Sequence, residues 1–232
     1  MRHRQAPRIL VTGFGRFPGM PANPSSGLAS ALARSRRLRS GQVEARILPT
    51  RWSEAEGFPA VLDAAPDIVL MLGVAGRRRH VTIELVAHNA TGLLPDAARA
   101  RPIARRLERN GPERRRLGAA PMPLLRALRE AGAPARLSRD AGRYVCNALA
   151  WRAYAWAQAG SRADGGQRLA VFVHIPRAGV IPTATLKRAL AALLVALAGQ
   201  YRPVEPRSVV PKEQGDAALA ASQGPLTAAA GR

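Results

Sequence analysis

The stretch DIVLMLG, residues 67–73, decides the architecture that this chain can adopt. Its apolar residues follow one another without alternation, which is typical of a strand covered on both faces. RLAVFVHIP at 168–176 is a second run of this kind, and RILVTG at 8–13 is a shorter one. Strands of this type need helices above and below them, so these runs predict a largely parallel sheet between two helical layers.

Segments with strand-like and helix-like patterns alternate on both sides of these runs. Further strands are expected at 42–49, 80–89 and 135–138, and helices at about 25–37, 53–65, 121–131, 143–159 and 183–201. Ser25 or Ser26 is the expected N-cap of the first helix. The pattern predicts an α/β fold, a three-layer α/β/α sandwich around an open, mostly parallel twisted sheet. Residues 1–202 are expected to form one domain and 203–232 a disordered tail.

Cysteine usage and charge narrow the function classes. One cysteine in 232 residues excludes an intramolecular disulfide, and no signal peptide is recognisable, so we expect a cytoplasmic protein without membrane association. The net charge is +21, yet only Lys187 and Lys212 of the 36 basic residues are lysines. The arginines are scattered and are not interleaved with stacking aromatics, so we expect no specific nucleic-acid site. Non-specific attraction to polyanions at low salt remains expected.

Three residues in these segments could carry chemistry. Cys146 stands at the start of the helix at 143–159, where backbone N–H groups would lower the pKa of a thiol and could hold an oxyanion. His174 ends a buried strand, and ligands of open α/β sheets bind at the carboxyl ends of strands. Glu84 lies in a mostly apolar strand, where a carboxylate needs a partner.

Each of these residues also has a plain structural interpretation. Cys146 could be core packing, His174 a structural histidine, and Glu84 the partner of an arginine. Together they fit a thiol hydrolase in which Cys146 attacks, His174 takes the proton and Glu84 orients the ring. His80 and His88 are rival bases because both flank Glu84. The histidines and the cysteine have no metal-ligand spacing, and the glycines of GFGRFPG do not open a helix, so neither a metal nor a dinucleotide is expected.

Four blocks in order resemble the pyroglutamyl peptidase I (pyrrolidone-carboxylate peptidase) family of cysteine peptidases. They are ILVTGFGRFPGMPANPS, GVAGRRRHVTIELVAHN, SRDAGRYVCN and VFVHIP, and they span residues 9 to about 200. The resemblance implies the triad Glu84, Cys146 and His174, no cofactor, and often a homotetramer. The implied reaction is hydrolytic removal of an N-terminal pyroglutamyl residue from a peptide with a blocked N-terminus, through a thioester acyl-enzyme.

The resemblance also implies a pocket for the lactam ring. Its expected lining residues are Phe14, Phe17, Asn23, Val74, Leu94, Tyr144 and Val145. Val74 replaces a glutamine that is usual in the family, and the loop NATGLLPD is one residue shorter than usual. Restoring a hydrogen bond to the lactam at position 74 is expected to improve kcat/KM, unless Tyr144 has taken over that contact. The alternatives are a thiol hydrolase of another small acyl group, and a catalytically weak homologue that binds its ligand.

Overall fold

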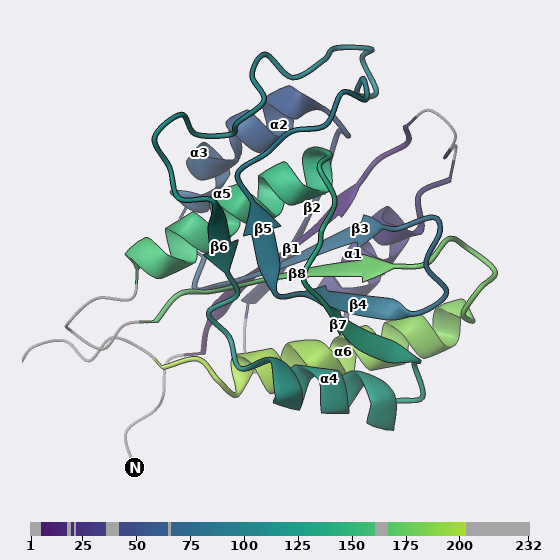
Figure 1. Ribbon diagram of the computed structural model, residues 1–232. Helices are drawn as coiled ribbons and strands as arrows, with labels where there is room; N and C mark the ends of the chain where they lie inside the picture. Colours follow the sequence, from purple (N-terminus) through teal and green to yellow (C-terminus); the bar gives the residue numbers. More distant parts are fainter. Residues whose placement is uncertain are drawn as a thin grey trace, which may run out of the picture.

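The computed structural model describes residues 6–17, 20, 22–35, 42–64, 66–160 and 167–202. Its main sheet has six strands in the order β2-β1-β3-β8-β4-β7 (Figure 1). These strands are β1 (Arg8–Phe14), β2 (Gln42–Leu48), β3 (Ile68–Val74), β4 (Val81–Glu84), β7 (Ala135–Ser138) and β8 (Leu169–Ile175). Neighbouring strands pair in parallel except β4 and β8, which pair antiparallel, so the prediction of an open, mostly parallel sheet is confirmed.

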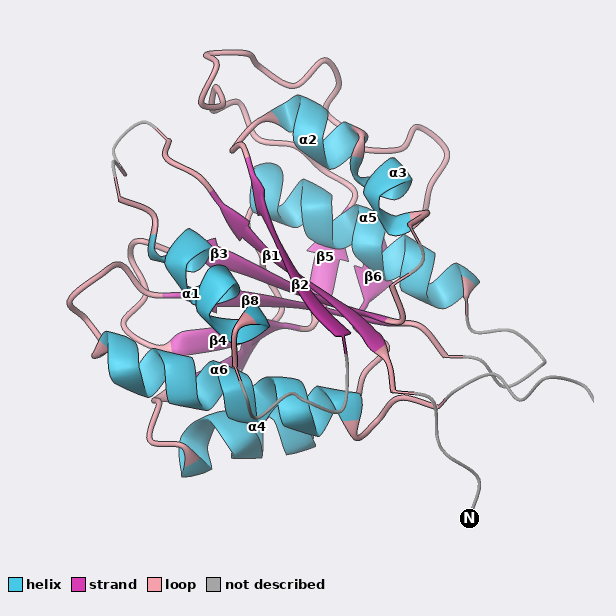
Figure 2. Ribbon diagram, turned by 180° about the vertical axis from the view of Figure 1, so that it is seen from behind, coloured by secondary structure: helices cyan, strands magenta, loops and turns pink. Residues whose placement is uncertain are grey.

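Two helical layers cover the sheet, as Figures 1 and 2 show from opposite sides. One layer consists of α1 (Pro24–Ala33), α4 (Pro121–Glu130) and α6 (Thr183–Ala198). The other consists of α2 (Trp52–Glu56), α3 (Phe58–Leu62) and α5 (Val145–Ala159), beside the ribbon formed by β5 (Val86–His88) and β6 (Arg114–Arg116). The three-layer sandwich is therefore also confirmed. Within the described residues, no helix is long and apolar enough to cross a membrane.

Alternation along the central strands divides their side chains between two apolar clusters. The α5-side cluster includes Phe14, Phe58, Met71, Trp151, Tyr154 and Phe172. The α6-side cluster includes Leu70, Leu72, Ile83, Val173, Leu128 and Leu190. Because successive residues of a strand point to opposite faces, the residue beside a buried one belongs to the other cluster. This rule determines which side chains at the sheet edge can meet.

Four local expectations were wrong, each for a visible reason. The expected strand at 80–89 is divided after Glu84: Leu85 leaves the main sheet, and β5 pairs with β6 instead. β6 lies in an arginine-rich segment where the sequence pattern predicted neither a strand nor a helix. The helix expected at 53–65, with a disturbance near Pro59, is interrupted two residues earlier and divides into α2 and α3 at Gly57. Helix α1 is capped by Asn23 rather than by a serine, and Pro24 occupies its first turn, where its missing N–H costs nothing.

The expected tail, 203–232, lies outside the described residues.

Candidate active site

Near the carboxyl ends of β3 and β8, His174 on β8 comes close to Cys146 on the first turn of α5. Gly73 pairs with His174 in the parallel β3–β8 register. A Cβ built on Gly73 would lie 3.1 Å from Sγ of Cys146 and 2.8 Å from Cζ of Phe172. The thiol therefore lies over the backbone of β3 beside the histidine-bearing strand, in space that only a glycine leaves open.

Glu84 and His174 are brought together across the antiparallel β4–β8 pair. Thr82 is the register partner of His174, so Glu84, two residues further along β4, faces the same side of the sheet. Nδ1 of His174 lies 2.8 Å from Oε1 of Glu84. Because a carboxylate only accepts, Nδ1 carries the proton and Nε2 is left available for another partner. Glu84 is fully buried and His174 is 5% exposed.

Arg78 is one of the site residues that sequence reasoning missed. Its guanidinium donates to Oε1 of Glu84, the oxygen that His174 also contacts, and to Oγ1 of Thr82. It also donates to the backbone carbonyl of Asp140 at 2.6 Å. Arg78 thus ties the carboxylate to the loop that leads into α5. Residue type alone does not separate Arg78 from Arg77 and Arg79, but the family pattern that this block resembles, G-x-A-G-x-R-x-x-I-x-x-E, has its arginine at position 78 and could have identified it.

The pKa of Glu84 lies below its ordinary value. Burial is the largest single influence and raises the pKa, but the hydrogen bond and charge of His174, the hydrogen bond of Ser138 and the charge of Arg78 together outweigh it. The carboxylate is consequently ionised at neutral pH, as an acceptor for the Nδ1–H of His174 must be.

The thiol of Cys146 does not have the low pKa that its place at a helix start predicted. Burial and, to a smaller extent, the negative charge of Glu84 together raise its pKa to about 12. The sulfur packs against the α5-side cluster, where water that would stabilise a thiolate is displaced. In the free protein the group is therefore a thiol at neutral pH. Any nucleophilic role requires a base to remove its proton during attack.

The rival histidines have surroundings that differ from those of His174. His88 lies in β5, and its Nε2 is 3.0 Å from the carbonyl of Arg139. His80 precedes β4, and its pKa is lowered by burial and by the charges of Arg136 and Arg78. Of the three candidates, His174 is the one in contact with Glu84.

The expected pocket residues do not all lie together. Phe14 and Val145 are buried in the α5-side cluster, and Tyr144 and Phe17 are partly exposed. The Tyr144 hydroxyl donates to the carbonyl of Pro95 at 3.0 Å, and its ring meets that of Trp52 edge-on at 5.5 Å. Tyr144 therefore joins the start of α5 to the loop that carries Leu94.

The three other expected lining residues have different surroundings. Leu94 is 67% exposed, at the tip of its loop. Val74 packs against the α6-side cluster, on the face opposite to that of Gly73 and Cys146. The side chain of Asn23 is engaged within the protein: Nδ2 donates to the carbonyl of Gly15, and Oδ1 accepts from N and Oγ of Ser25. The structure accordingly does not bring Val74 together with the thiol, and it gives Asn23 a capping role.

Asn147, the residue after the cysteine, was also missed. It is fully buried, its Oδ1 accepts from N of His88, and its Nδ2 donates to the carbonyls of His88 and Ala90. These bonds fasten β5 and the following loop to the first turn of α5. Sequence spacing could not reveal them, because they join residues nearly sixty positions apart.

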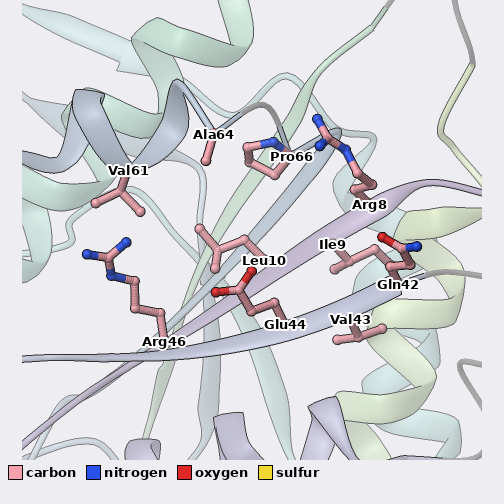
Figure 3. Close-up of a pocket in the computed structure, with 10 residues that line it drawn as sticks. All are labelled: Arg8, Ile9, Leu10, Gln42, Val43, Glu44, Arg46, Val61, Ala64 and Pro66. Atoms are coloured by element: carbon pink, nitrogen blue, oxygen red, sulfur yellow. The ribbon is translucent and has the colours of Figure 1, made fainter.

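A cavity of about 450 Å³ lies at the other end of β1 and β2, and Figure 3 shows its lining. Arg8 and Gln42, the first residues of these strands, contribute to it, together with Glu44 and Arg46. Its described lining has no thiol or imidazole, and it lies at the amino ends of strands whose carboxyl ends face the site. The cavity is therefore not the site of the chemistry discussed here. The described residues also contain no cluster of His, Cys, Asp and Glu suited to a metal ion.

Known proteins resemble this chain in sequence and in fold. The profile of a family described as pyroglutamyl peptidase matches residues 7–197. The pyrrolidone-carboxylate peptidase of Streptomyces coelicolor is 35% identical over 206 residues, covering 82% of this chain and 92% of the relative. That of Levilactobacillus brevis is 31% identical, over 73% of this chain and 81% of the relative.

Solved structures share the fold. Pyroglutamyl peptidase I from Bacillus amyloliquefaciens superposes with a TM-score of 0.73 at 24% identity, covering 87% of this chain and 99% of that one. Pyrrolidone carboxyl peptidase from Thermococcus litoralis gives a TM-score of 0.75 at 22% identity, covering 83% and 94%.

Proposed function

Because the chain belongs to the pyroglutamyl peptidase family, we propose that it is a cysteine exopeptidase that removes an N-terminal pyroglutamyl residue from peptides. The observation that carries the assignment of roles is the contact of 2.8 Å between His174 and the buried carboxylate of Glu84, at the strand pair over which Cys146 lies. We assign Cys146 as nucleophile, His174 as general base and acid, and Glu84 as the group that orients His174.

Acylation begins with the protonated thiol. Nε2 of His174 takes the proton of Cys146 while Sγ attacks the carbonyl carbon of the pyroglutamyl residue. Glu84 stabilises the imidazolium that forms, because its Oε1 accepts the Nδ1–H. The tetrahedral intermediate collapses as His174 returns the proton to the leaving nitrogen, the C–N bond breaks, and the shortened peptide departs from a thioester on Cys146.

Deacylation repeats the exchange with water. His174 takes a proton from the water that attacks the thioester, and it gives that proton to the sulfur as the C–S bond breaks. Free pyroglutamate leaves, and the thiol is restored. The thiol's proton departs on the amine of the shortened peptide, a proton from water restores the thiol, and His174 ends the cycle as it began, so the cycle needs no cofactor.

The first turn of α5 supports the oxyanion of both steps. The helix begins at Val145, and no side chain caps it. The N–H groups of a first helical turn have no carbonyl partner within the helix, and they point along its axis with the positive end of the helix dipole. The N–H of Cys146 itself lies in this turn. It can therefore stabilise the oxyanion that forms on the carbon bonded to the Cys146 sulfur.

Further features of the enzyme belong to the same proposal. Phe14, Phe17, Leu94, Tyr144 and Val145 would shape the lactam pocket, directly or by supporting its walls. Residues 1–202 would form a single domain. The enzyme would act in the cytoplasm, in keeping with its single cysteine, and would assemble as a homo-oligomer.

The test is hydrolysis of a pyroglutamyl-fluorophore beside its alanyl and prolyl analogues. We expect turnover of the pyroglutamyl substrate, at least about a hundredfold preference over the other two, and loss of turnover in Cys146→Ser with folding intact. The prolyl analogue is the sharpest control, because it keeps the five-membered ring and lacks the lactam carbonyl. Equal turnover of the prolyl and pyroglutamyl substrates would refute lactam recognition, and sustained turnover by Cys146→Ser would refute the assigned nucleophile.

A further inference from the structure

The hydroxyl of Tyr154 lies between the strands that carry Glu84 and His174. Tyr154 belongs to α5 and is 1% exposed. Its hydroxyl donates to the backbone carbonyl of Glu84 at 2.6 Å and accepts from the backbone N–H of Phe172 at 3.3 Å. A side chain of the helix thus bridges the main chains of β4 and β8.

This bridge stands where the two strands would otherwise bond to each other. The antiparallel register pairs Thr82 with His174 and Ile83 with Val173, and its next step would set Glu84 opposite Phe172. The ladder stops before that step, and the Tyr154 hydroxyl satisfies both backbone groups instead. The strands are held apart at the residue whose carboxylate orients the histidine.

The same helix carries the nucleophile. Cys146 stands eight residues before Tyr154, which corresponds to about 12 Å along a helix axis. Phe172 lies two residues before His174 on the same face of β8, and the two rings are 4.8 Å apart. Through one hydroxyl, α5 therefore controls the separation of β4 from β8, and so the position of Glu84 relative to His174.

We propose that Tyr154 is a positioning residue for the Glu84–His174 pair: its hydroxyl acts as a spacer in the β4–β8 ladder that holds both groups in register with Cys146. The inference rests on the proposed function, and it adds a requirement that the triad alone does not contain. Without the hydroxyl, the carbonyl of Glu84 and the N–H of Phe172 would close on each other or admit water, and either change moves Glu84 relative to the imidazole.

Burial keeps the bridge constant over the working pH range. It raises the pKa of Tyr154, and the charge of Glu84 raises it further. The hydroxyl remains a neutral donor and acceptor while the catalytic groups exchange protons.

Comparing Tyr154→Phe with Tyr201→Phe tests the proposal. Tyr201 is the matched control: its hydroxyl donates to Oδ1 of Asp67 at 3.0 Å, just before β3 begins and at the opposite end of the sheet from the thiol. We expect Tyr154→Phe to lower kcat about ten- to a hundredfold, as a misplacement of up to 1 Å does, with KM within about twofold. Tyr201→Phe should keep the wild-type kcat. Equal kcat values for Tyr154→Phe and wild type would overturn the proposal.

A spectroscopic readout separates this inference from the proposed function. The Nδ1–H of His174, held by Glu84, should give a low-field proton resonance that shifts or disappears in Tyr154→Phe and is unchanged in Tyr201→Phe. This measurement requires no turnover, so it holds even if pyroglutamyl substrates are not cleaved. An unchanged resonance in Tyr154→Phe would refute the positioning role.

A second replacement covers the case in which Tyr154→Phe does not fold. In p-aminophenylalanine at position 154, the amine keeps donating to the Glu84 carbonyl but accepts poorly from the N–H of Phe172. With half of the bridge retained, we expect a folded protein whose kcat lies clearly below that of the wild type. A wild-type kcat in this variant would contradict the spacer role.

Discussion

Arg78 and His174 contact the same oxygen of Glu84, Oε1, from opposite directions along the chain. The second oxygen, Oε2, is buried without a hydrogen-bond partner among the described residues. The carboxylate is therefore held by one atom between a permanent cation and a histidine that gains and loses its charge. Its ionisation depends on both neighbours, which makes Arg78 a sensitive position although it does not touch the thiol.

Replacing Arg78 should raise the pH below which the enzyme loses activity and stability. The folded pKa of Glu84 is depressed, so its charge stabilises the protein above the unfolded pKa, and that contribution is lost as the pH falls through the folded pKa. Arg78→Met removes one depressing charge and raises the folded pKa. Loss of kcat/KM and of thermal stability on acidification should both begin at higher pH, as pH–rate profiles and melting curves would measure. Arg77→Met, at an exposed neighbour, should leave both unchanged; a matching shift there would point to a general charge effect.

Glu84→Gln should change hydrolysis and alkylation in opposite directions. The amide keeps the shape of the side chain but cannot stabilise an imidazolium, so kcat should fall about a hundredfold or more. The lost negative charge also lowers the pKa of Cys146, since Glu84 contributes to raising it. Iodoacetamide should therefore modify the variant faster than the wild type at pH 8. Slower alkylation would show that Glu84 activates the thiol instead of opposing its ionisation.

His174→Ala should lose nearly as much activity as Cys146→Ser, because a nucleophile and its base act as a unit. His88→Ala is the control, since that imidazole contacts the carbonyl of Arg139 and not Glu84. Rates with the pyroglutamyl-fluorophore decide the matter. If His88→Ala loses activity while His174→Ala keeps it, His88 rather than His174 is the general base.

Gly73→Ala should damage the site at a position that carries no chemistry. The added Cβ would approach the Phe172 ring to 2.8 Å and Sγ of Cys146 to 3.1 Å, so ring and sulfur must both shift. We expect kcat to fall about tenfold or more, in line with small displacements of reacting groups. Gly27→Ala, where a Cβ meets nothing within 4 Å, should keep full activity. Wild-type kinetics for Gly73→Ala would mean that the thiol has room to adjust at no cost.

Val74→Gln now carries a different expectation from the one that the family pattern suggests. The partly buried Val74 side chain packs against the α6-side cluster, so an amide there would lie against apolar groups, at a cost of up to about 1–3 kcal/mol if unpaired. We expect a lower melting temperature and a KM for pyroglutamyl substrates within about threefold of wild type. A tenfold or greater drop in KM would show that position 74 reaches the lactam after all.

Layer order and strand position could be predicted because they follow from local pattern. The uninterrupted apolar runs at 67–73 and 168–176 correspond to β3 and β8, and the family blocks identified the family. Contacts between distant segments could not be predicted. Three features depend on contacts between side chains and backbone far apart in the sequence, and no spacing rule encodes them. They are the departure of Leu85 from the main sheet, the hydrogen bonds of Asn147 to β5, and the bridge that Tyr154 forms between β4 and β8. The prediction of a lowered pKa for the Cys146 thiol was wrong for the same reason. The sequence indicated that the cysteine begins a helix, but it did not indicate that the thiol is buried.

The segment from Asn89 to Glu108 is pinned at both of its ends and leaves its tip, Leu93 and Leu94, in solvent. Asn147 fixes its entry beside the nucleophile, and the Asn89 side chain binds N and O of Glu108 at its exit. Within the segment, the N–H of Gly92 also donates to the carbonyl of Arg143, and the carbonyl of Pro95 accepts from the Tyr144 hydroxyl, so the residues on both sides of the tip are tied to the start of α5. Sequence drift can therefore accumulate at the solvent-exposed tip alone without disturbing the catalytic groups, and exchanging Leu93 and Leu94 offers a way to engineer acyl preference on an unaltered reaction centre.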